Sequence, residues 1–135
     1  MVFRRGLIAA LWLGSLVAAF FIGDLVSKLQ ADTPERPPSA LVKELPPDWE
    51  SGAEELTRRV QAAFPIGSSE EAMATALRAQ GFELQTWNAK PGEEKRADRY
   101  QLTPSCRIRA SILWRIDDAG KITELKADYH EAGCL

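Results

Sequence analysis

Two cysteines and one histidine are the residues best suited to covalent or metal chemistry in this chain of 135 residues. Cys106 and Cys134 both follow an apolar stretch near the N-terminus. An even number of cysteines in an exported domain predicts a disulfide. In a reducing compartment the pair would instead be free thiols or half of a metal site, with His130 as the only further ligand nearby. A zinc site needs about four ligands. We therefore expect a Cys106–Cys134 disulfide and no metal or other cofactor.

His130 is also the only histidine available as a general base. No nucleophile motif accompanies it, and a Ser-His-Asp or Cys-His arrangement would have to use it. Alternation along its strand places it on the polar side of a sheet, across from Arg107. Asp117 and Asp118 have the surroundings of a turn and not those of a carboxylate pair. The sequence therefore predicts a protein without enzymatic activity.

Three arginines alternate along the polar side of one expected strand: Arg107, Arg109 and Arg115. Such a stripe is typical of a solvated face of an antiparallel sheet with cross-strand pairs. It is also what a face that binds a partner would present, with Leu113 among the arginines. Trp87 is a further candidate for an exposed aromatic residue, because alternation along the strand places it on the opposite face from Phe82 and Leu84. We keep these three arginines and Trp87 as a candidate partner-binding face.

The N-terminal part of the chain contains an uncharged stretch of 18 residues, Gly6–Gly23. A helix of this length, rising about 1.5 Å per residue, would cover about 27 Å, just enough to cross the core of a bilayer. Arg4 and Arg5 precede the stretch and predict a cytoplasmic N-terminus, with the rest of the chain outside. We expect residues 1–23 to be an uncleaved signal-anchor in the inner membrane. A cleaved signal peptide, which would leave a secreted or periplasmic protein, is the alternative.

Without Arg4 and Arg5, 15 of the 17 basic residues remain against 19 acidic ones, a net charge of about −4. Both signs are mixed along the chain. A nucleic-acid-binding protein would need a basic footprint, and we expect no nucleic acid as a partner. The expected partners are the membrane, through the N-terminal helix, and an envelope protein.

Residues 24–48 are expected to be a linker. Five prolines are spaced through this segment with charges between them: Pro34, Pro37, Pro38, Pro46 and Pro47. Proline removes a hydrogen-bond donor and favours extended backbone, which predicts a semi-rigid spacer that does not pack. Residues 49–135 would then form one small domain outside the membrane.

Two helices are expected at the start of this domain. The first runs from a capping box at Ser51–Glu54 to Pro65, and the second from a capping box at Ser68–Glu71 to Gly81. From Phe82 the apolar period changes from 3.6 to 2. This predicts strands at 82–87 and 99–103, separated by a polar, flexible loop at 88–98.

The C-terminal hairpin is expected to join strands 106–116 and 121–129 through a turn at 117–120. A four-residue turn fixes the register and predicts three facing pairs: Ile116–Lys121, Ile112–Leu125 and Arg109–Asp128. In this register Cys106 faces Glu131, three residues short of Cys134. The chain would have to curl back at residues 132–133 to close the disulfide. The predicted fold is α+β, with a transmembrane helix followed by two helices on a three- to four-stranded antiparallel sheet (ααββββ).

Two stretches give the chain a family resemblance. FPIGSSEEAMATALRAQGF at Phe64–Phe82, with its glycine-serine turn, and the hairpin at Cys106–Tyr129 resemble the small outer-membrane-assembly lipoproteins of the SmpA/OmlA type and the related inhibitor-like fold. The resemblance covers residues 50–130 and implies two helices followed by an antiparallel sheet. The chain departs from that family in having no lipidated cysteine after the signal. It also resembles uncharacterised membrane-anchored envelope proteins, for which no activity is implied, and no site residues are transferred.

The sequence thus predicts a non-enzymatic, membrane-tethered protein of the cell envelope that binds or scaffolds a partner. Tethering would raise its effective concentration near membrane partners. The alternative is a secreted or periplasmic enzyme inhibitor or small-ligand-binding domain. That alternative would be favoured if Trp87 and the loop at 88–98 formed an ordered, concave surface.

Overall fold

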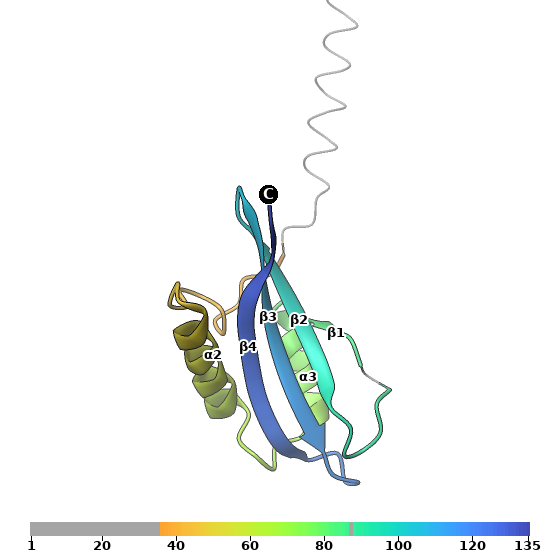
Figure 1. Ribbon diagram of the computed structural model, residues 1–135. Helices are drawn as coiled ribbons and strands as arrows, with labels where there is room; N and C mark the ends of the chain where they lie inside the picture. The colour runs from red at the N-terminus through yellow and green to blue at the C-terminus, as the bar shows by residue number, and fades with distance from the viewer. Residues whose placement is uncertain (1–35, 87) are drawn as a thin grey trace, which may run out of the picture. The chain divides into compact units, whose positions relative to one another are not determined.

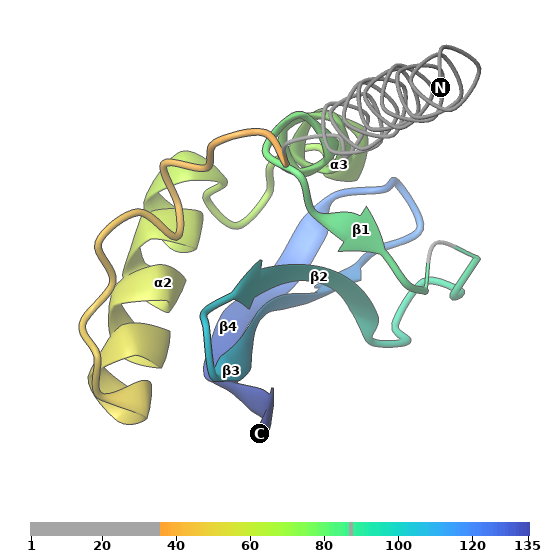
Figure 2. The ribbon, with the colours of Figure 1, turned by 90° about the horizontal axis from the view of Figure 1, so that it is seen from above.

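The computed structural model describes residues 36–86 and 88–135 (Figure 1). Its helices and strands follow one another as α2 (Trp49–Ala63), α3 (Glu70–Ala79), β1 (Glu83–Leu84), β2 (Lys95–Leu102), β3 (Cys106–Ile116) and β4 (Ile122–Cys134). The strands form one antiparallel sheet in the order β1-β2-β3-β4. Both helices lie on the same side of this sheet (Figure 2). The predicted α+β arrangement of two helices on an antiparallel sheet is confirmed.

The expected anchor at residues 1–23 and residues 24–35 of the expected linker lie outside the described residues, as does Trp87. Within residues 36–86 and 88–135, no helix is both long enough and apolar enough to cross a bilayer.

The hydrophobic core lies between the helices and one face of the sheet. The even-numbered residues of β3 face it, and Ile112 and Trp114 are almost completely buried. The helices contribute residues at helical spacing, and the core as a whole comprises Leu41, Val42, Leu56, Val60, Met73, Leu77, Phe82, Ala97, Ala110, Ile112, Trp114, Ile116, Ile122, Leu125 and Tyr129. Burial of this apolar surface is the main force that holds the layers together.

Residues 36–45 form a strap that packs against the domain. Figure 2 shows it running from the end of α3 along α2. Leu41 and Val42 are 5% and 4% exposed and belong to the core. Arg59 of α2 donates to carbonyls of the strap, including that of Lys43 at 2.6 Å. The prediction of an unpacked spacer is therefore wrong for these residues, because two apolar side chains between the prolines supply a packing face. The compact unit begins at Arg36.

α2 begins three residues earlier than the capping box at Ser51–Glu54 predicted. Asp48 is the N-cap, and its carboxylate accepts a hydrogen bond from the Ser51 amide at 2.9 Å. Trp49 is thus the first helical residue, and its ring packs on that of Tyr129 with centroids 5.5 Å apart. A Cβ atom at Gly52 would lie 2.5 Å from the Tyr129 ring. Glycine at this position therefore allows α2 to approach β4 closely.

α2 also covers the edge of the sheet that β4 forms. The Thr57 hydroxyl accepts from the Ala127 amide at 3.0 Å and lies 3.3 Å from the Ala127 carbonyl. Gln61 Nε2 donates to the Leu125 carbonyl at 2.9 Å. Unpaired backbone groups on an edge strand invite pairing with another chain. Two side chains of α2 satisfy these groups along the middle of β4.

α3 ends as the sequence predicts. Gly81 has φ 77°, and the Phe82 amide donates to the Leu77 carbonyl at 3.0 Å, which is the pattern of a Schellman cap. Phe82 then turns back into the core at 3% exposure. The following strand is much shorter than predicted, since only Glu83 and Leu84 pair with β2.

The register of the β3–β4 hairpin differs from the prediction. Its turn has five residues instead of four, so that Ile116 faces Ile122. Two irregularities, at residues 115/116 and 107/108, each shift the register by one further residue. The result places Cys106 directly opposite Cys134, and the predicted curl of the chain is not needed. A shift of two residues in the central part leaves every side chain on its predicted face, since side chains alternate with a period of two.

Candidate functional site: the helix-free face of the sheet

The candidate partner-binding arginines lie on the face of the sheet that neither helix covers, which we call the helix-free face. Arg107, Arg109 and Arg115 are odd-numbered residues of β3, whereas its core-facing residues are even-numbered. Arg107 is exposed, and the other two are half-buried. The structure therefore places the three predicted arginines on one face. Trp87, the fourth predicted residue, lies outside the described residues.

Each of these arginines has a partner within the chain. The Arg107 guanidinium lies 4.0 Å from the centroid of the Tyr100 ring, a cation–π contact. Arg109 Nη2 lies 2.7 Å from His130 Nε2. Arg115 donates to the Gly92 carbonyl at 2.6 Å, and it pairs with a glutamate of β4 at 3.1 Å. The stripe is thus a set of internal pairs, of which Arg107 is the most accessible to a partner.

His130 is held from both sides of its ring. Its Nδ1 lies 2.9 Å from a carboxylate oxygen of Asp128, and its Nε2 faces the Arg109 guanidinium. An arginine has no lone pair to offer, so Nε2 accepts this hydrogen bond and Nδ1 donates to Asp128. The prediction that His130 lies across from Arg107 is wrong, because the register shift places it opposite Arg109.

A serine, a histidine and an aspartate do lie near one another on this face, yet they do not form a catalytic triad. Ser111 is paired with Asp128 across β3 and β4, but its hydroxyl donates to Asp98 at 2.6 Å. The Nε2 lone pair of His130, which would have to accept the serine proton, is occupied by Arg109. The side chains form ion pairs and hydrogen bonds with one another, and none of them is placed to activate the Ser111 hydroxyl.

The centre of the helix-free face is closed by a polar cluster that sequence reasoning missed. Asp98 and Ser111 are 1% and 2% exposed. The other carboxylate oxygen of Asp98 lies 3.0 Å from the guanidinium of Arg96. Asp98 was expected at the end of a flexible loop. Charged residues occupy both faces of residues 95–99, so the segment lacks the apolar alternation that would have identified it as a strand.

A shallow pocket of about 250 Å³ lies beside this cluster. Leu113 is its half-buried apolar residue on the helix-free face, and charged side chains surround it. Two ion pairs of the pocket join Lys126 to Glu94 at 3.3 Å and Arg115 to Glu124 at 3.1 Å. One half-buried apolar side chain thus lies within a ring of charged side chains.

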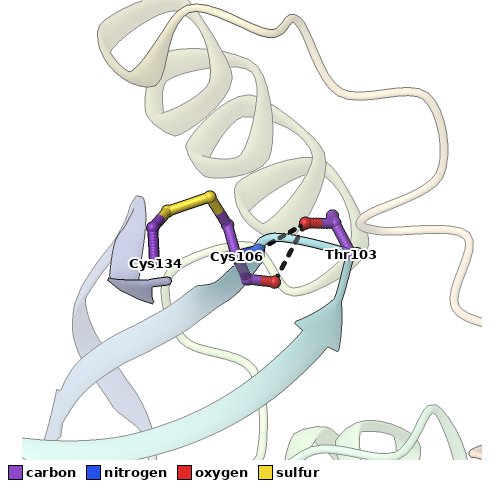
Figure 3. Close-up of a disulfide and its surroundings, with 3 residues drawn as sticks. All are labelled: Thr103, Cys106 and Cys134. Carbon is purple, nitrogen blue, oxygen red and sulfur yellow. Dashed lines mark hydrogen bonds between the residues drawn. A yellow bond between two sulfur atoms is a disulfide. The ribbon is translucent and has the colours of Figure 1, made fainter.

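The disulfide Cys106–Cys134 joins the start of β3 to the end of β4 (Figure 3). The two Cα atoms are 4.0 Å apart. Thr103 supports the bridge, since its hydroxyl accepts from the Cys106 amide at 2.9 Å and donates to the Cys106 carbonyl at 3.0 Å. Glu131 is the only other metal-binding type of side chain that the described residues gather with the two sulfurs. Because the sulfurs are bonded to each other, they are not available as thiolate ligands.

A second missed cluster is buried on the helix-covered face. Glu70 is 8% and Lys95 is 4% exposed, and their charged atoms are 2.8 Å apart. The indole nitrogen of Trp114 donates to the same carboxylate at 2.8 Å. The predicted flexible loop at 88–98 is wrong at its end, because β2 begins at Lys95 and carries this side chain into the interior. Glu70 lies in the first turn of α3, where the helix dipole also favours a carboxylate.

No protein-family model matches this chain, and it has no match among curated proteins or solved structures. The resemblance to SmpA/OmlA-type envelope domains stays a prediction.

Proposed function

We propose that this protein is a non-enzymatic binding or scaffolding module of the cell envelope, tethered to the inner membrane by residues 1–23 with its C-terminal domain outside the cytoplasm. The observation that carries the proposal is the Cys106–Cys134 disulfide. Structural disulfides persist in oxidising compartments and are rare in the cytosol. An uncharged stretch long enough to span a bilayer, preceded by Arg4 and Arg5, supports the same location.

The helix-free face is the surface we assign to the partner. Leu113 lies there in a shallow pocket, and the ion pairs Lys126–Glu94 and Arg115–Glu124 are partly exposed. Exposed ion pairs contribute little to folding stability. They can therefore exchange internal partners for those of a bound protein at low cost. The proposed partner is an envelope protein, and nucleic acid is not proposed.

A secreted or periplasmic inhibitor or small-ligand binder is the second candidate. One observation favours it: Glu94, from the loop before β2, lines the pocket at Leu113. A small molecule in contact with this loop would fit the pocket, whereas a protein partner would cover the whole face. Cleavage after the apolar stretch would accompany this second function.

The test is chemical cross-linking in intact cells, followed by purification of the tagged full-length protein from the membrane fraction. The Leu113→Glu and Arg107→Glu variants would each lose a specific envelope partner that the wild type retains. Ile66→Glu is the matched control, since Ile66 is 60% exposed and lies in the connection between the helices, away from this face. Retention of the partner by both test variants would reject the helix-free face. A soluble, N-terminally shortened protein would reject the tether.

A further inference from the structure

Arg99 is a buried arginine with hydrogen-bond donors that no described residue accepts. It extends from the helix-covered face of β2 and is 7% exposed. Its Nη2 donates to the Pro37 carbonyl at 2.9 Å. Its Nε and Nη1 are buried and have no hydrogen-bond partner among residues 36–86 and 88–135. Burial of a charged donor without an acceptor lowers the stability of the folded state, and native structures seldom contain such a donor.

A second arginine lies against the first. Arg36 donates through Nη1 to the carbonyl of Tyr100, and its Nη2 is 3.5 Å from the Glu83 carboxylate. Both arginines reach the same glycine: a Cβ atom at Gly81 would lie 2.8 Å from Arg36 Cγ and 3.0 Å from Arg99 Nη1. The pKa of Arg99 is lowered by burial and, to a lesser extent, by the charge of Arg36. Two like charges thus converge where one of them is already poorly solvated.

The described part of the chain supplies little negative charge to this place. Glu83 pairs with Arg36, but its side chain is 62% exposed, and no ion pair to Arg99 is formed within residues 36–86 and 88–135. The end of α3 next to Gly81 carries a partial negative charge that favours cations. Its carbonyls nevertheless accept nothing from Arg99 Nε or Nη1. Two donor nitrogens of Arg99 without an acceptor and an excess of positive charge remain.

We propose that Arg36 and Arg99 form a binding site for a small oxyanion with the chemistry of phosphate. Guanidinium groups present paired donors that match the oxygens of phosphate, and a bound anion would separate the two like charges. Arg36 is exposed and Arg99 is buried, so the ligand would reach Arg99 by displacing the Arg36 side chain. Free inorganic phosphate and the phosphate of a lipid head group share this chemistry. The inference goes beyond the proposed function and does not depend on the tether.

The test uses the full-length protein in maltoside micelles and follows the side-chain Nε–H signals of Arg36 and Arg99 by NMR. Inorganic phosphate is titrated at constant ionic strength. We expect a saturable shift of the Arg99 signal. The Arg36→Gln variant should bind at least about tenfold more weakly, the effect of losing one charge-assisted contact. Arg58→Gln is the matched control, because Arg58 is exposed on α2 and pairs with Glu55, and its affinity should be unchanged.

Arg99→Gln should abolish the shift of Arg36. If that variant does not fold, Arg36→Gln still decides the matter, since Arg36 lies on the surface. Nanodiscs of phosphatidylglycerol and of phosphatidylcholine, without added phosphate, identify the source of the anion. A shift of Arg99 in the anionic lipid alone indicates a head group, and a shift with inorganic phosphate alone indicates the free ion. An Arg99 signal that is unchanged by phosphate and identical in both lipids would overturn the site, as would wild-type affinity in Arg36→Gln.

Discussion

The two faces of the sheet both hold charged residues, but they do so in different ways. On the helix-covered face the pair Glu70–Lys95 is almost completely buried, together with an indole donor. On the helix-free face most pairs are partly exposed, and only the centre at Asp98 and Ser111 is closed. Buried pairs are costly to break, whereas exposed pairs contribute little. The contrast is between one face whose ion pair is buried and another whose ion pairs remain accessible to water.

Removal of Glu70 should have the largest effect. The change Glu70→Ala takes away the buried carboxylate that both Lys95 and Trp114 contact, and we expect a loss of about 3–5 kcal/mol in the free energy of unfolding. Glu71→Ala is the matched control, because Glu71 is the next residue and is exposed. It should change stability by less than about 0.5 kcal/mol. Urea unfolding followed by circular dichroism measures both, and equal losses would remove the distinction between the two environments.

Loss of the disulfide should come next. Cys106 and Cys134 are separated by 28 residues, and a loop of this size is worth about 3–4 kcal/mol in the chain-entropy model. The paired change of both cysteines to alanine should therefore lower the free energy of unfolding by that amount. The bridge lies at the opposite end of β3 from Trp114, the contact of Glu70, so the two losses should add. A paired variant as stable as the wild type would contradict this estimate.

Removal of Asp98 tests the closed centre of the helix-free face. Asp98→Ala would leave the buried hydroxyl of Ser111 without its acceptor and Arg96 without its ion pair. We expect a loss of about 1–3 kcal/mol, less than for Glu70→Ala, because Arg96 is partly exposed and water can replace its partner. The same unfolding measurement applies. A loss as large as that of Glu70→Ala would show that the two faces are equally dependent on buried charge.

Arg107→Ala should have the smallest effect of the substitutions on the helix-free face. The contact of Arg107 with the Tyr100 ring lies at an exposed site, where a cation–π pair is worth about 0.5–1 kcal/mol. Partner binding, in contrast, should weaken clearly if this face is the docking surface. Stability and cross-linking measured on the same variant separate the two roles. Loss of stability together with unchanged cross-linking would assign Arg107 to the fold alone.

A pH dependence of stability is expected from α2. A hydrogen bond from Arg58 and, to a lesser extent, one from Arg59 lower the pKa of Glu55 to about 2. Because this pKa is lower in the folded than in the unfolded chain, the stabilisation is present above about pH 4.5 and is lost as the pH falls toward 2. The effect is small, since the site is exposed to solvent. Unfolding measured between pH 5 and pH 2 should depend on pH less steeply in Glu55→Gln than in the wild type, and equal slopes would contradict the assignment.

The sequence predicted those parts of the fold that depend on local patterns, such as the spacing of apolar residues or a single glycine. The change from helical to strand spacing at Phe82 identified the two helices and the sheet, and the glycine at 81 identified the end of α3. The alternation along Cys106–Ile116 assigned its residues to the two faces even though the register was wrong by two. The disulfide was also predicted, because two cysteines that follow an expected export signal favour a disulfide over a metal site, which needs about four ligands.

Features that depend on distant contacts were not predictable. A local rule favoured Ser51 as the helix cap, although Asp48 takes this position. Lys95 was expected in solvent because its buried partner Glu70 lies 25 positions earlier in the sequence. Nothing in the composition of the linker indicated that Leu41 and Val42 would pack into the hydrophobic core. In the candidate site, the sequence assigned the three arginines to the correct face. Their partners within the chain were not predictable, because two irregularities in the β3–β4 pairing shift the register.

We propose that the disulfide-closed domain lies outside the cytoplasm while the chain stays attached to the membrane. A single alkylation experiment on intact cells tests it, with a thiol reagent that does not cross the inner membrane and with detection of the mass shift in the membrane fraction. We expect no labelling of Cys106 and Cys134 before reduction and labelling of both after reduction, on the full-length protein. Labelling without reduction, or only after the inner membrane is broken, would contradict it.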